Sequence, residues 1–155
     1  MTRTGKIAAM LAAAMLSAAT AMPAQAAPLD NAEKLRKLDI MLMVTGLRCR
    51  TTPDDFQRDF QAFEAAHLDI LNGATSDLRN SLVERYGLTG ASRALDRIST
   101  AMANRYGQGH PALSCGELKA ATRALARIRG KAELVVAAER LLMADSSSHL
   151  AFAGR

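Results

Sequence analysis

Two histidines have sequence environments in which an imidazole could act near neutral pH. His67 follows Phe60 and Phe63 at helical spacing, so it lies on an apolar stripe. This pattern predicts a buried, hydrogen-bonded core histidine, and the alternative is a pH-sensitive group whose protonation loosens the fold. His110 lies in a loop with Gly109 and Pro111, a setting that fits a binding residue as well as a solvated turn.

Two groups of basic residues are the other binding candidates. Lys119, Arg123 and Arg127 recur every four residues and share one face of an expected helix. Arg48 and Arg50 flank a cysteine at an expected helix end, where positive charge favours the negative end of the helix dipole. Solvated charge explains both groups. The functional interpretation is a surface for an anionic envelope component, such as a polymer or lipid headgroup, or for an acidic protein.

No residue pattern predicts a catalytic or metal centre. The chain has no C-x-x-C, no paired-histidine metal motif and no Gly-x-Ser-x-Gly. The adjacent carboxylates Asp54 and Asp55 fall at an expected helix start, where the helix dipole accounts for them. We therefore expect no metal and no cofactor, and we favour a non-enzymatic protein. The expected role is binding or support of the cell envelope. The alternatives are a small hydrolase of unknown substrate with His67 or His110 as its base, and a pH-responsive periplasmic chaperone.

The N-terminus predicts export. Arg3 and Lys6 precede an apolar run that ends near Met22, and Pro-Ala-Gln-Ala at 23–26 supplies a small-x-small cleavage site. We expect residues 1–26 to be a cleaved signal peptide, with an uncleaved anchor as the alternative. Cleavage lowers the formal net charge from +5 to +3, a mild bias towards anionic partners, and we expect no nucleic-acid partner. No later stretch is long and apolar enough to span a membrane, so we expect a periplasmic or secreted protein.

Cys49 and Cys115 are the two cysteines of the chain. Two cysteines in an exported protein most often form one disulfide, which here would close a loop of 66 residues. Two free thiols are the alternative.

Composition and spacing predict an all-α, single-domain bundle of five or six helices. Ala, Leu and Arg dominate, and no strand-like alternation occurs. The apolar run Leu38–Arg50 completes a first helix from Asp30 and should form the hub of the bundle. The second helix should begin at Pro53 with Thr52 as its N-cap, and then bend or break at 72–73.

The second half of the chain predicts three further helix ends and a tail. Gly87 and Gly107 each follow Arg-Tyr, so both are expected to be left-handed C-caps, and Arg93 and Arg97 lie four residues apart on the helix between them. Ser114 opens a capping box before a helix that should end near residue 130. A last helix is expected over 131–144, giving a helical domain over 27–145 and a flexible tail over 146–155.

Three segments resemble a family of small exported alphaproteobacterial proteins: Leu42–Arg50, Phe56–His67 and Arg105–Pro111 with Cys115. The resemblance covers most of the mature chain. Some members carry the name S-adenosyl-L-homocysteine hydrolase. That enzyme binds NAD on a Rossmann domain through a Gly-x-Gly-x-x-Gly turn after a strand. Here no strand is expected, and the glycines at 107 and 109 run into His110-Pro111, so the resemblance implies export and a helical fold but not this activity.

Overall fold

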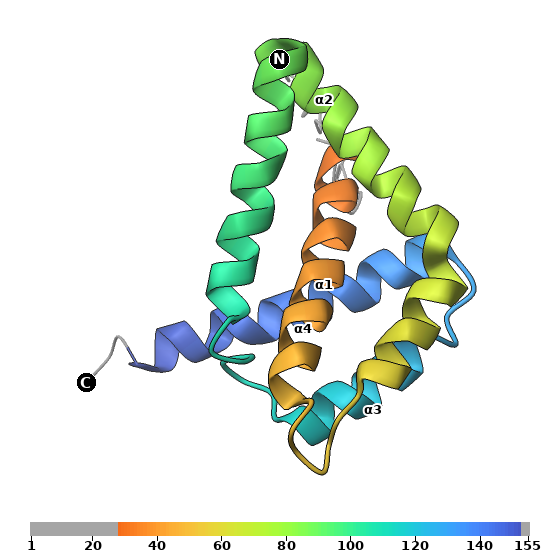
Figure 1. Ribbon diagram of the computed structural model, residues 1–155, viewed down its shortest axis with the longest axis vertical. Coiled ribbons are helices and arrows are strands. Elements are labelled where there is room, and N and C mark those ends of the chain that lie inside the picture. Colours follow the sequence, from red (N-terminus) through yellow and green to blue (C-terminus); the bar gives the residue numbers. More distant parts are fainter. Residues whose placement is uncertain (1–27, 153–155) are drawn as a thin grey trace, which may run out of the picture.

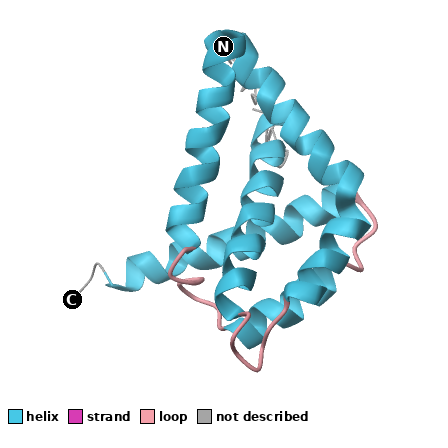
Figure 2. Cartoon of the chain, in the orientation of Figure 1, coloured by secondary structure: helices cyan, strands magenta, loops and turns pink. Residues whose placement is uncertain are grey.

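The computed structural model describes residues 28–152, with side-chain surroundings for residues 31–143. The predicted signal peptide, residues 1–26, lies outside the described residues. Four helices make up the described chain: α1 (Pro28–Cys49), α2 (Gln57–Tyr106), α3 (Cys115–Leu125) and α4 (Lys131–Phe152). This range contains no strand (Figure 2), which confirms the all-α prediction, whereas the predicted number of five or six helices is wrong.

The helix count differs because α2 is 50 residues long and folds back on itself. Two of its residues are not helical, His67 (φ −122°, ψ 16°) and Gly87 (φ 70°, ψ 172°). The chain reverses at Gly87, so residues 68–86 (the first arm) and 88–106 (the second arm) form a helical hairpin (Figure 1). This combination of φ and ψ is open to glycine almost alone. The predicted C-cap at Gly87 is thus a turn inside α2, and the helix runs unbroken through the predicted bend at 72–73.

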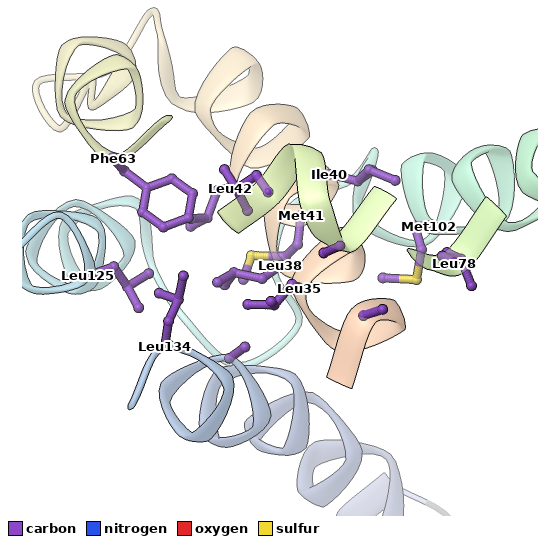
Figure 3. Packing of buried hydrophobic residues seen from close by; sticks show 14 of the residues in the cluster. Leu35, Leu38, Ile40, Met41, Leu42, Phe63, Leu78, Met102, Leu125 and Leu134 are labelled. Atoms are coloured by element: carbon purple, nitrogen blue, oxygen red, sulfur yellow. The ribbon is translucent and has the colours of Figure 1, made fainter. Parts of the chain in front are cut away.

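α1 is the hub that the sequence predicts. It lies between the two arms of α2, and it contacts α2, α3 and α4 (Figure 1). Because neighbours surround it, side chains on several of its faces are buried. Its largest fully buried side chains are Leu35, Leu38, Met41, Leu42 and Thr45. In Figure 3 the leucines of α1 lie between Phe63, Leu125 and Leu134 on one side and Leu78 and Met102 on the other.

The predicted start of the second helix at Pro53 is wrong, because α2 begins at Gln57. Thr52 does not cap α2. Its hydroxyl donates a hydrogen bond to the last carbonyl of α1, 2.8 Å away. Phe56 is fully buried, and its ring lies 3.4 Å from where a Cβ on Gly46 would be. The turn before α2 brings this ring onto α1, so packing of Phe56 delays the helix start.

Three other helix ends differ from the sequence prediction. Gly107 is the C-cap residue of α2 but has right-handed φ and ψ (−60°, −26°), and the positive φ falls at Gly109 (108°). α3 ends at Leu125, five residues before the predicted end at Gly130. α4 extends to Phe152, past the predicted end near residue 144. The division into a domain over 27–145 and a tail over 146–155 stays a prediction.

Candidate functional site

The predicted disulfide is confirmed. Cys49 and Cys115 are bonded through their sulfur atoms, with Cα atoms 5.8 Å apart. Cys115 opens α3 inside the predicted capping box, in which Ser114 Oγ accepts the N–H of Glu117 (3.3 Å) and Glu117 Oε2 accepts the N–H of Ser114 (2.8 Å). The N–H and the hydroxyl of Ser114 (2.7 Å) both donate to the Glu117 carboxylate, and these two hydrogen bonds lower the pKa of that group. The disulfide therefore joins the end of α1 to a well-capped helix start.

His67 lies at the first bend of α2 and is only 2% exposed. Its Nε2 lies 2.9 Å from the carbonyl oxygen of Leu125. Because a carbonyl oxygen only accepts, the ring donates this hydrogen bond. The ring also packs against Phe63, with centroids 5.2 Å apart. This is the environment predicted for a core histidine, and it ties α2 to the last residue of α3.

His110 is also buried, at 9% exposed, and its ring stacks on Tyr106 with centroids 5.6 Å apart. Its Nδ1 accepts the backbone N–H groups of Ala112 (3.2 Å) and Leu113 (3.1 Å). An acceptor nitrogen carries no proton, so the geometry fixes the tautomer and uses this ring to hold the loop before α3. Neither His110 nor His67 lines either of the two hollows described below.

The basic group on α3 is largely engaged within the chain. Lys119 Nζ donates to the carbonyl of Pro53 (3.4 Å), and Arg123 Nε lies 2.9 Å from Asp59 Oδ1. The first contact joins α3 to the turn before α2, and the second joins it to the first turn of α2. Arg127 is exposed and lies beyond the end of α3, so it does not continue the predicted face. The structure therefore favours an intramolecular role for Lys119 and Arg123.

Arg48 and Arg50 are exposed and line one open hollow of about 450 Å³ beside the disulfide end of α1. Leu47, which is half exposed, also lines it. The structure thus brings these two predicted candidates together. None of the residues that line this hollow is buried, so it offers no apolar floor beneath the two arginines. This hollow is the weaker of the two candidate sites.

Asp39 of α1 and Glu64 of α2 are two carboxyl groups whose pKa values are raised. Burial raises the pKa of Asp39, and the Arg36 guanidinium, 3.2 Å from its Oδ2, opposes that effect. Burial also raises the pKa of Glu64, and the negative charge of Asp39 adds to the rise. Both groups therefore hold a proton more readily in the folded chain than in the unfolded one. No three His, Cys, Asp or Glu side chains gather as metal ligands anywhere in the part of the chain that the structure describes.

The second hollow lies between the arms of the α2 hairpin, and we call it the hairpin pocket. Its volume is about 350 Å³. Its apolar floor comes from both arms: Leu78, Leu82, Ala94 and Ile98. Three of these side chains are buried and Ile98 is half-buried. Exposed polar side chains surround the floor, and the pocket therefore combines an apolar base with a solvated, polar edge.

Two arginines dominate the charge of this pocket. Arg85 on the first arm and Arg97 on the second both line it and are both exposed. Among residues 28–152, neither guanidinium has an ion-pair or hydrogen-bond partner. Glu33 of α1 also lines the pocket, but its carboxylate oxygen lies 2.6 Å from Lys37 Nζ. Positive charge without an internal partner is therefore available at the pocket edge.

None of the residues predicted as binding candidates lines the hairpin pocket. The sequence gives one partial signal, because Arg97 repeats a four-residue spacing with Arg93. Arg85 and Tyr86, in contrast, look like the end of a helix before a capping glycine. Only the reversal at Gly87 places them opposite the second arm.

No helix within residues 28–152 combines the length and apolar character needed to cross a membrane. Comparisons of the chain with protein-family profiles, with curated proteins and with solved structures each gave no match. The resemblance to the alphaproteobacterial family therefore stays a prediction. The functional argument depends on the geometry of this chain.

Proposed function

We propose that this chain is an exported, non-enzymatic protein that binds a small ligand in the hairpin pocket. The observation that carries the proposal is the pairing of a buried apolar floor with two arginines that have no ion-pair or hydrogen-bond partner among the residues that the structure describes. Ligand pockets are concave and mostly apolar, hold a few polar groups, and measure about 300–1,000 Å³. The hairpin pocket, at about 350 Å³, has these properties.

The two buried histidines support a binding role over a hydrolase. A general base must lie within hydrogen-bonding reach of its substrate. His67 donates to Leu125, and His110 Nδ1 accepts two backbone N–H groups. Each interaction fixes a ring in the core, away from the hairpin pocket.

Export is supported by the disulfide and by the N-terminal pattern, since disulfides persist in oxidising compartments. The test is to express the full chain in a Gram-negative host and to determine the N-terminal residue in the periplasmic and culture fractions. We expect the protein in one of these fractions, beginning at Ala27. Recovery only with the cytoplasmic fraction, with residues 1–26 retained, would refute export.

Ligand binding is tested with Nile red, a neutral apolar dye, and a variant that fills the pocket. Ala101 lines the pocket and is exposed, so Ala101→Phe places a ring in the hollow without disturbing the core. Ala65→Phe, at an exposed helical position outside the pocket, is the matched control. We expect saturable one-site binding to the wild type and the control, and loss of binding in Ala101→Phe. Equal binding by all three proteins, or none, would overturn the proposed function and favour a purely supporting role in the envelope.

A further inference from the structure

We infer that the ligand of the hairpin pocket is a single-chain amphiphile, with one apolar chain and one anionic head group, either a carboxylate or a phosphate. The inference rests on the proposed function, because it names the ligand class of the same site. It follows from the size of the pocket, from its floor and from the charge at its edge.

The size of the pocket limits the buried part of the ligand. At about 350 Å³ the pocket lies at the small end of the ~300–1,000 Å³ range of ligand pockets. A pocket of this size suits one alkyl chain of medium length better than two chains. Because Leu78 and Leu82 on the first arm and Ala94 and Ile98 on the second line it, the chain would lie between apolar side chains of both arms.

The edge of the pocket selects the charge of the head group. Arg85 and Arg97 come from opposite arms, so an anion between them would meet a guanidinium from each. Guanidinium groups match carboxylate and phosphate oxygens through paired N–H donors. Glu33 forms its ion pair with Lys37 and not with either arginine. A cationic head group would therefore be repelled, and a neutral one would gain no ion pair.

Tyr86 completes the edge next to Arg85. Its side chain lines the pocket and is half exposed, so its ring can cover part of a chain while its hydroxyl stays in water. The exposed end of the pocket is thus amphipathic, as its proposed ligand is.

The test is displacement of Nile red by four compounds with the same chain: decanoate, decyl phosphate, decanol and decyltrimethylammonium. We expect one or both anions to displace the dye about tenfold more tightly than decanol, from two partly exposed ion pairs. The cation should bind more weakly than decanol. The ratio between the two anions identifies the head group. Shortening decanoate to octanoate should weaken binding about fifteenfold, because two methylenes leave the floor.

The decisive variant is Arg85→Gln with Arg97→Gln. It should lose about tenfold in affinity for the preferred anion and keep its affinity for decanol. The matched control is Arg79→Gln with Arg93→Gln, which removes one exposed arginine from each arm and the same net charge, but outside the pocket. The control should keep the affinity of the wild type for the anion.

The outcomes separate this inference from the proposed function. Equal displacement by decanoate, decyl phosphate and decanol, with Nile red still blocked by Ala101→Phe, would overturn the anionic head group and leave pocket binding standing. An equal loss of affinity for the anion in the two double-arginine variants would mean that net charge attracts the anion from a distance. That result would also overturn the inference. Failure of Nile red itself to bind is the outcome that removes the proposed function.

Discussion

Removal of the disulfide between Cys49 and Cys115 should cost a large share of the stability of this fold. The bond closes a loop of 66 residues, for which the loss of loop-closure entropy in the unfolded chain corresponds to about 4 kcal/mol at 25 °C. Single domains are stable by only about 5–15 kcal/mol in total. Because α1 contacts every other helix, loosening its last turn affects the whole core.

Urea unfolding of the mature chain measures this contribution in two ways. For a slope of about 2 kcal/mol per molar urea, the loss lowers the unfolding midpoint by about 2 M. The wild type is compared with and without reductant, and with Cys49→Ala/Cys115→Ala, which should not respond to reductant. Agreement between the reduced wild type and the variant separates the cross-link from the side-chain change at the buried Cys49. A shift below about 1 kcal/mol on reduction would refute the reasoning, since the unfolded chain would then be constrained by other means.

Three further predictions, two on the hairpin and one on the carboxyl groups of Asp39 and Glu64, are each read from urea midpoints. Gly87→Ala should destabilise the fold by about 1–3 kcal/mol, because the φ and ψ of this residue suit only glycine. Gly73→Ala, where no atom lies within 4 Å of the added Cβ, should stabilise it by up to about 1 kcal/mol. Equal effects of the two substitutions would contradict a chain reversal at Gly87. Ala94→Leu should raise the free energy of unfolding by about 2 kcal/mol, because the larger side chain fills the pocket floor. The same variant should lose Nile red binding, and retained binding would show that the dye binds outside the pocket. The third concerns pH. Because the folded chain raises the pKa of Asp39 and of Glu64, their contribution to stability is fully present below the unfolded-state pKa and is lost as pH rises through the folded-state value. The free energy of unfolding of the Asp39→Asn/Glu64→Gln variant, relative to that of the wild type, should therefore be higher at about pH 7 than at about pH 4. A difference between the two proteins that does not change with pH would contradict this.

The sequence predicts well those features that local chemistry determines. Ser114 and Glu117 form their capping box because both partners lie within one helical turn. Cys49 and Cys115 leave one possible intramolecular pairing. His67 is predicted to lie in the core because it shares a helical stripe with aromatic residues. The position of α1 as the hub follows in the same way from apolar residues on most of its faces.

The features that the sequence misses depend on contacts between distant segments. Thr52 has the chemistry of an N-cap, but burial of the Phe56 ring on Gly46 outweighs one capping hydrogen bond and moves the helix start. A glycine such as Gly87 marks a helix end equally well whether the chain leaves the helix or doubles back into another. The hairpin pocket exists only in the second case, so Arg85 cannot be assigned to a site from the sequence.

The two ends of α1 differ in how they are held, and this difference suits a binding protein. At Cys49 a covalent bond and a capped helix start fix the fold. Near Glu33, at the other end, the second arm presents Ala94 to the pocket, where a larger side chain would fill the space between the arms. Small residues there forgo apolar burial that would stabilise the hairpin, and they leave room that a ligand chain can use. A ligand that binds only the folded chain would stabilise it by RT ln(1 + [L]/Kd), where [L] is the concentration of free ligand. Under the proposed function, stability and ligand binding would compete for one volume at the hairpin end, while the disulfide holds the other end of α1.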